Sequence, residues 1–276
     1  MEAKNLRRTR PKRRLSLITD AILFAVVMII VFPLINTFNL SVYNTGNKLE
    51  RIENINEALP IVAIKSQTDE IDKQNEYLIE YIKKSYGVTI KYGIDSNQLT
   101  KMVNANLLNN EYIANVNINK LKESLEKYPS DFFNIFKLKN NRYTLTLVLV
   151  DKFNNDNLAL AAKTNYSKYT IYISNTEEFN RAFHHEMFHI MEYYISDIKS
   201  NNNLFSNWNN LNPSGFKYSS NIENLNWEYV YKDNLDLSTV YFITRYSKFS
   251  NKEDRAEIFA ELMNNNKRPK YLNGYR

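Results

Sequence analysis

Residues 184–189 read HHEMFH, and this stretch decides how the rest of the chain is interpreted. It contains all three histidines of the 276-residue sequence. Within it, His185, Glu186 and His189 form the pattern H-E-x-x-H. Residues four apart lie on one face of an α-helix, so both imidazoles can reach one metal ion while Glu186 faces the same cleft. The pattern predicts metal-assisted hydrolysis, in which a carboxylate deprotonates a zinc-bound water.

The residues around the motif favour the helix that this chemistry needs. Chance explains the motif poorly, since a shuffled chain of this composition would show it roughly twice in a thousand trials. Residues 169–173 (YTIYI) are typical of a strand, and the polar residues 174–176 after them are good helix caps. Apolar residues then recur at helical spacing and should pack inward, leaving the motif on another face: Phe179, Phe183, Met187, Ile190, Met191 and Tyr194.

The charge of the chain is concentrated at its amino terminus. The formal net charge is +6, and residues 1–14 contain seven Lys or Arg and one Glu. The other residues balance, with 29 basic and 29 acidic side chains. No basic face is left for a phosphate backbone, so we predict no nucleic-acid partner.

A long apolar run comes directly after the basic cluster. Residues 15–38 are long enough to span a membrane, and the cluster before them predicts a cytoplasmic tail at 1–14 and an exterior location for the chain beyond residue 38. A cleaved signal peptide is the rival interpretation. Because the run is long and no small-x-small cleavage site comes after it, we favour an uncleaved single-pass anchor in the cell membrane. Residues 39–66 are polar and predict a stalk.

Helices precede strands in the remaining sequence. An amphipathic pattern predicts a helix over 68–86 that Gly87 ends, and then a short strand at 88–92. A second helical stretch, 118–136, is interrupted near Pro129. Strands are expected at 142–151, 158–162 and 169–173. The layout predicts an α+β domain with a small antiparallel or mixed sheet.

Residues 200–236 are rich in Asn and contain Trp208 and Trp227. Such runs are usually solvated loops; the alternative is a loop over the cleft whose aromatic side chains contact substrate, and the sequence alone does not separate the two.

The metal needs a third ligand from elsewhere in the chain. The sequence has no cysteine, so thiolate sites and disulfides are excluded and the ligand should be Asp or Glu. Residues 251–263 predict a helix on which Glu253, Glu257 and Glu261 share one face. A cation would relieve the repulsion among them. A plain solvated acidic face is the alternative.

These residues resemble a motif of the glutamate-ligand zinc peptidases, the gluzincins. The similarity is greatest to the group that contains the catalytic domain of anthrax lethal factor and the Pro-Pro endopeptidases. There, H-E-x-x-H is succeeded some tens of residues later by Y-x6-E-x-x-A-E-x-F. This chain has Tyr246, six residues, and then EDRAEIF at 253–259. Residues 257–261 also fit E-x-x-A-E, but the tyrosine spacing favours Glu253.

The resemblance implies a zincin-like metalloprotease domain over residues 67–276, with a C-terminal helical part. It implies His185, His189 and Glu253 as zinc ligands and Glu186 as general base. It also implies that Glu257 is a carboxylate just outside the ligand set, and that the Tyr246 hydroxyl stabilises the oxyanion. The edge strand that pairs with substrate backbone would be formed by Tyr169, Thr170, Ile171, Tyr172 and Ile173.

The leading hypothesis is therefore a membrane-anchored, outward-facing zinc endopeptidase with peptide or protein substrates. Two other classes stay open. One is a catalytically silent binding or sensor module, although an intact Glu186 argues against it. The other is a metal-dependent hydrolase of a non-peptide amide.

Overall fold

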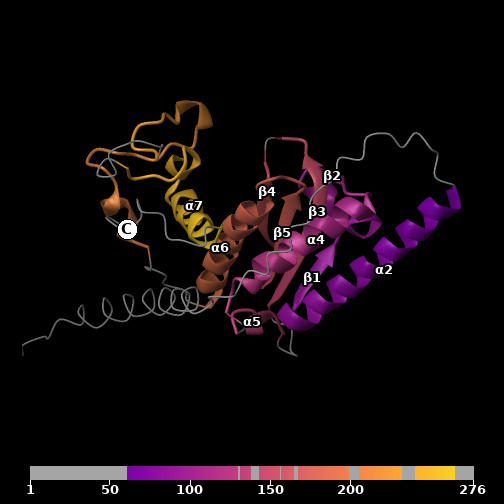
Figure 1. Ribbon diagram of the computed structural model, residues 1–276. Coiled ribbons are helices and arrows are strands. Elements are labelled where there is room, and N and C mark those ends of the chain that lie inside the picture. Colours follow the sequence, from indigo (N-terminus) through magenta and orange to yellow (C-terminus); the bar gives the residue numbers. More distant parts are fainter. Residues whose placement is uncertain are drawn as a thin grey trace, which may run out of the picture. The chain divides into compact units, whose positions relative to one another are not determined.

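A computed structural model describes residues 61–129, 131–137, 143–155, 157–164, 167–198, 205–231 and 240–264, with side chains from residue 69 onward. These residues form the predicted α+β arrangement, a small mixed sheet with helices packed on it (Figure 1). The predicted cytoplasmic tail (1–14), the predicted span (15–38) and most of the predicted stalk lie outside the described residues. Among the described helices, none combines the length and the apolar character that crossing a membrane requires.

The sheet has the order β1-β3-β5-β4 and mixes strand directions. Its strands are β1 (Val88–Lys91), β3 (Thr144–Phe153), β5 (Lys168–Ser174) and β4 (Ala159–Thr164). β3 pairs in parallel with both β1 and β5, whereas β4 runs antiparallel to β5. The short β2 (Ala105–Leu107) pairs antiparallel with the far end of β3. The predicted strands are thus confirmed to within two residues at each end.

The predicted edge strand was wrong. Residues 169–173 belong to β5, which lies inside the sheet because β3 pairs with one side of it and β4 with the other. Six of its seven residues are buried. A near-continuous apolar run is typical of a strand buried on both faces, which is the pattern this segment shows. Among the described residues, β4 pairs with β5 alone and forms one edge of the sheet, whereas β1 is at the other end of the strand order.

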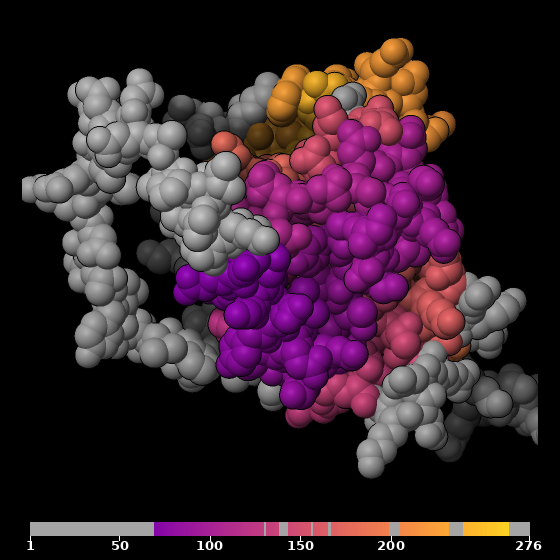
Figure 2. Space-filling view, turned by 90° about the vertical axis from the view of Figure 1, so that its right-hand side faces the viewer, coloured from indigo at the N-terminus to yellow at the C-terminus, as the bar shows by residue number. Residues whose placement is uncertain are grey.

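Three long helices pack on the sheet. They are α2 (Ile61–Tyr86), α4 (Glu111–Glu126) and α6 (Phe179–Ile198). α2 contacts β1 and α4, α4 contacts α6, and α6 contacts β4 and β5, so the row of helices follows the order of the strands. In the view of Figure 2, the described part of α2 (indigo) and the residues that come after it in the chain (purple) form a continuous surface. α2 begins at Ile61, so the last residues assigned to the stalk belong to this helix.

Gly87 ends α2 as predicted. Its φ of +69° lies in the left-handed region, which costs a side chain strain that glycine avoids. An added Cβ would also stand 2.9 Å from the backbone of Phe136. The turn therefore has a conformational and a steric reason for glycine, and it sends the chain directly into β1.

The strands carry a buried layer on each face. One layer consists of Val148, Val150, Phe153 and Tyr172, against which partly buried residues of α3 (Asn97–Met102) and β2 pack. Alternate residues of β3 point to the opposite face, since successive side chains of a strand do so. These are Leu145, Leu147 and Leu149, all essentially inaccessible to solvent. β3 is therefore buried on both faces of the sheet.

The motif helix packs as its apolar spacing predicts. Phe179, Phe183, Met187 and Ile190 are fully buried, whereas Met191 and Tyr194 are half-buried. α7 (Asn251–Asn264) packs against α6 on its other side. The remaining helical turns are η1 (Gly93–Ser96), α5 (Asn134–Lys137), η2 (Trp208–Leu211), η3 (Ile222–Asn224) and η5 (Tyr246–Lys248). Two helices, one on the sheet and one outside it, thus meet at the motif.

Candidate metal centre

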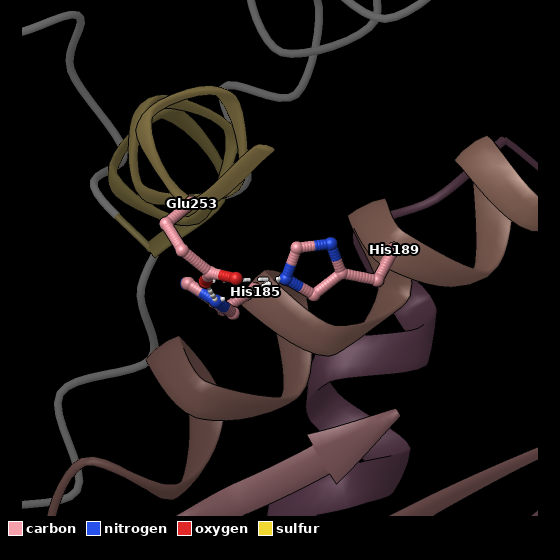
Figure 3. Close-up of side chains that lie close together, drawn as sticks. All are labelled: His185, His189 and Glu253. Atoms are coloured by element: carbon pink, nitrogen blue, oxygen red, sulfur yellow. Dashed lines mark hydrogen bonds and ion pairs between the residues drawn. The ribbon is translucent and has the colours of Figure 1, made fainter. Parts of the chain in front are cut away.

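α6 places two histidine rings one turn apart. The Nε2 atoms of His185 and His189 are 3.2 Å from each other, and both rings are largely shielded from solvent. Glu253 reaches them from the first turn of α7, with Oε2 at 2.9 Å from His185 Nε2 and 3.4 Å from His189 Nε2. Figure 3 shows the three side chains converging from the two helices.

The spacing of these donor atoms fits a single metal ion. Two imidazole nitrogens and one carboxylate oxygen lie within 4.8 Å of one another. Ligand atoms bound at 2.0–2.1 Å in a tetrahedral zinc site are separated from each other by roughly 3.3 Å, close to the distances found here. The donor types are also those that zinc accepts in sites with three protein ligands. The described residues therefore hold a preformed N, N, O cluster that is compatible with a metal ion.

The electrostatics of the cluster favour a positive charge between the side chains. Burial lowers the pKa of His185, but hydrogen bonds to Glu253 and Glu257 outweigh it and raise the pKa to about 10. Burial likewise lowers the pKa of His189, and contacts with Glu192 and Glu253 raise it to about 9. Burial raises the pKa of Glu253, yet the two histidines bring it down to about 2. The neighbouring carboxylates thus favour the protonated, positively charged form of both imidazoles. A bound metal cation would supply positive charge at the same place.

Glu257 lies on the opposite edge of the His185 ring. Its Oε1 is 2.8 Å from His185 Nδ1, while Oε2 accepts hydrogen bonds from Thr244 Oγ1 at 2.7 Å and from Arg181. Glu261 is farther along α7, where its carboxylate is 3.9 Å from Arg181. Of the three glutamates on this face, Glu253 is the one whose oxygen meets both Nε2 atoms.

Glu186 stands beside the cluster without belonging to it. Its Oε2 accepts a 2.6 Å hydrogen bond from the backbone N–H of Ala161 in β4. The side chain is buried, and this burial raises the pKa of its carboxyl, although the two histidines and Ala161 act in the opposite direction. A carboxylate whose pKa is raised next to a metal site is suited to accept a proton near neutral pH.

Tyr246 borders the same space. Its ring is 6.0 Å from that of His185 and is stacked on Phe249 at 5.5 Å. The side chain is 41% exposed, so its hydroxyl is accessible to a bound molecule. Burial, and after it the charges of Glu253 and Glu186, raises its pKa, which keeps the phenol protonated and able to donate a hydrogen bond.

A cleft of about 1090 Å³ is lined by the three cluster residues and by Glu186, Glu257 and Tyr246. Edge strand β4 and the residues before it form one wall, through residues 157–161. The other walls come from α6, from η5 and its flanks, and from the first turns of α7. None of residues 169–173, which were predicted to form the substrate-pairing strand, lines the cleft. Residues of β4 and the segment before it line it instead.

The Asn-rich segment has an anchored part. Trp208 Nε1 and Tyr218 OH each donate a 2.8 Å hydrogen bond to the same carboxylate oxygen of Asp254. Within the same region, Phe205 and Ile222 line the cleft. The described part of this segment is therefore attached to α7 next to Glu253, and it contributes a wall. Sequence reasoning did not single out Asp254, because a charged residue between two predicted site glutamates looks like part of an acidic face.

Sequence reasoning also overlooked Arg181 and Thr244, the hydrogen-bond partners of Glu257. Arg181 lies one turn before the motif on α6, a spacing that places it near His185. That spacing was a usable signal for Arg181. Thr244 lies in an irregular segment two residues before Tyr246, and no local pattern marks it.

Comparison of the chain with protein-family models, with curated proteins and with solved structures finds no match. The resemblance to the gluzincins therefore rests on the motif residues and their spacing, and the activity that it implies stays a proposal.

Proposed function

We propose that this chain is a zinc endopeptidase with a zincin-like catalytic domain. The observation that carries the proposal is the preformed cluster of His185, His189 and Glu253, with the carboxylate of Glu186 in the same cleft but outside the cluster. Catalytic zinc sites use three protein ligands and leave a position open for water or substrate. A purely structural zinc site would close the fourth position with a protein ligand.

Each residue then has a chemical task. Zinc bound to this donor set would polarise the scissile carbonyl and lower the pKa of its water to about 7. Glu186 accepts the proton of that water and later passes it to the leaving amine. Tyr246 donates a hydrogen bond from its hydroxyl to the oxyanion that develops on the carbonyl. Glu257 accepts from His185 Nδ1 and fixes the tautomer that leaves Nε2 free for the metal.

The substrate would bind along β4 as an added strand. Leu158 O accepts a hydrogen bond from Ser174 N, and the register pairs Leu160 with Tyr172. Because backbone groups alternate in direction along a strand, those of Ala159 and Ala161 point away from β5. The hydrogen bond from Ala161 N–H to Glu186 agrees with that direction. Because the Ala161 N–H is used by Glu186, a peptide would pair with the N–H and C=O of Ala159 and the C=O of Ala161, next to the proposed general base.

The size of the cleft favours a peptide over a small amide. Sites for small ligands typically measure about 300–1,000 Å³, and this cleft of about 1090 Å³ lies just above that range, with residues 157–161 along one wall. An extended peptide would occupy that length, whereas a small amide would leave most of it to water. The hydrolase of a non-peptide amide remains the second candidate, and a silent binding module the third.

A peptide library separates these possibilities. The full chain, purified in detergent, is incubated with a diverse library, then with a chelator, and then with zinc restored. A zinc endopeptidase cleaves internal peptide bonds, loses this activity with the chelator and regains it with zinc. Failure of the zinc-loaded wild type to cleave any peptide would contradict the proposal. Glu186→Gln, prepared in the same way, controls for contaminating proteases.

We further propose that residues 15–38 anchor the protein in the cell membrane, with 1–14 in the cytoplasm and the catalytic domain outside. The support is the position of the basic cluster directly before the apolar run.

A further inference from the structure

Glu192 lies one turn after His189 on α6, against the side of the ring that does not face Glu253. Its Oε2 is 3.7 Å from His189 Nδ1. Its Oε1 accepts two hydrogen bonds from Arg255, from Nε at 2.8 Å and from Nη2 at 2.5 Å. Both side chains are largely shielded from solvent, with 14% and 6% exposure. A shielded ion pair held at two nitrogens is a fixed element, unlike a mobile surface pair.

Arg255 is itself held in place by aromatic rings. Its guanidinium lies 4.3 Å from the centre of the Phe205 ring and 5.7 Å from that of Trp208. Trp208 in turn donates its indole N–H to Asp254, the neighbour of Arg255 in α7. A planar guanidinium stacked on rings has few orientations available, and its hydrogen-bonding edge is therefore directed at Glu192.

Each of the two histidines thus has a carboxylate on its Nδ1 side, at 2.8 Å for His185 and at 3.7 Å for His189. His185 presents Nε2 to the cluster and Nδ1 to Glu257, while His189 presents Nε2 to the cluster and Nδ1 toward Glu192. A neutral imidazole donates from one nitrogen and accepts, or binds metal, through the other. A carboxylate at Nδ1 therefore keeps Nε2 free for a metal. The 3.7 Å between His189 Nδ1 and Glu192 Oε2 is an ion-pair distance, and because Arg255 holds the other carboxylate oxygen, Oε2 is left on the side of the ring.

We infer that Glu192 and Arg255 are positioning residues for His189. Glu192 accepts the Nδ1 proton of His189 and fixes its tautomer and ring orientation, and Arg255 acts through Glu192 by holding its carboxylate. The Phe205–Trp208 pair keeps Arg255 in place, so the wall of the cleft and the ligand are parts of one arrangement. The inference rests on the proposed metal centre and adds to it a second histidine–carboxylate pair.

The test measures zinc affinity without using activity. The full chain is loaded in competition with a chromophoric chelator, and cobalt is used in parallel because its visible spectrum reports ligand geometry. Loss of a carboxylate behind a metal-binding histidine typically weakens the metal by about 10–100-fold, and we expect this of Glu192→Ala. Glu192→Gln retains an oxygen that can accept the Nδ1 proton and should lie between Glu192→Ala and wild type. The cobalt spectrum should change in the same order.

A matched control removes a carboxylate from an ion pair outside the cleft. Glu126 pairs with Lys122 at 2.6 Å on α4, and Glu126→Gln should leave zinc affinity and the cobalt spectrum unchanged. If Glu192→Ala stays within about two-fold of wild type and its cobalt spectrum is unaltered, the inference is overturned. If wild type itself binds no zinc, the proposed metal centre fails instead, so the two failures are distinguishable.

Arg255 is tested by combining substitutions. Because Arg255 acts through Glu192, Arg255→Met should weaken zinc in the wild-type background but add nothing to Glu192→Ala. Additive losses would contradict this part of the inference, since independent sites add. Arg255→Lys gives the same comparison if Arg255→Met does not fold. It keeps the charge but loses the two-nitrogen contact and the ring stacking.

Discussion

The carboxylate of Glu186 accepts a 2.6 Å hydrogen bond from the backbone N–H of Ala161, which joins the motif helix to the edge strand of the sheet. If substrate backbone binds at that edge as we propose, this contact holds Glu186, the proposed general base, at a fixed position beside it. This contact does not require a charged partner, because a backbone amide serves. It therefore stays available when the base changes its protonation state.

We predict that Glu186→Gln keeps zinc and loses hydrolysis. Its side chain is outside the cluster of donor atoms, so metal affinity should stay as in wild type. An amide cannot accept the proton of water, so kcat should fall by at least about 10²–10⁴-fold. Zinc content by elemental analysis and cleavage of a peptide found in the library screen check the two halves. Wild-type turnover in this variant would refute the mechanism.

Glu253→Ala and Glu257→Ala should have different effects on zinc binding. Glu253 Oε2 meets both Nε2 atoms, so its loss should give metal-free protein under dilute conditions. Glu257 contacts His185 only at Nδ1, and its loss should weaken zinc by about 10–100-fold while leaving the site loadable. Chelator competition on both variants is the measurement. If their phenotypes are exchanged, the motif must be read one helical turn later, and Tyr246 loses its assigned role.

Tyr246→Phe removes a hydroxyl and keeps the ring stacked on Phe249. Zinc content should not change. Loss of one oxyanion donor typically costs about 2.7–4 kcal/mol of transition-state stabilisation, seen as a drop of about 10²–10³ in kcat with KM little affected. Steady-state kinetics of the folded, zinc-loaded variant test this. A change confined to KM would assign Tyr246 to ground-state binding of the substrate.

Zinc binding should release protons. In the metal-free protein the pKa of His185 is about 10 and that of His189 about 9, both above the ordinary 6.5, so both rings carry protons at pH 7. The pKa of Glu253, about 2, means that this carboxylate is already ionised. Loading one zinc near pH 7 should therefore release about two protons, and affinity should rise with pH until about pH 9–10. Calorimetry in buffers of different ionisation enthalpy counts the protons, and a pH-independent affinity would contradict the prediction.

For the membrane topology, we predict that external protease digests the bulk of the chain on intact cells. The basic cluster in 1–14 should stay inside while everything after the apolar run lies outside. Immunoblotting with tags at each end measures which end is protected. Protection of the carboxyl-terminal tag would reverse the orientation, and a wholly soluble mature form would support the cleaved signal peptide.

Features that depend on short-range periodicity could be predicted from the residue pattern alone. The placement of His185 and His189 on one face of a helix follows from their spacing of four residues. The inward packing of Phe183 and Met187 follows from the same helical repeat. The break after α2 follows from the backbone freedom of Gly87. These features could be predicted because each depends on residues within one or two helical turns of it in the sequence.

The identity of the edge strand beside the motif helix, and the contacts between side chains of different elements, depend on long-range packing. The apolar run of β5 fits a strand buried on both faces, but its second partner is β3, which precedes both β4 and β5 in the chain, and no local pattern indicates that pairing. Glu253 reaches His185 across 68 residues, and Arg255 reaches Glu192 across 63. The sequence spacing of such pairs carries no periodic signal, because their distance is determined by how α6 and α7 pack.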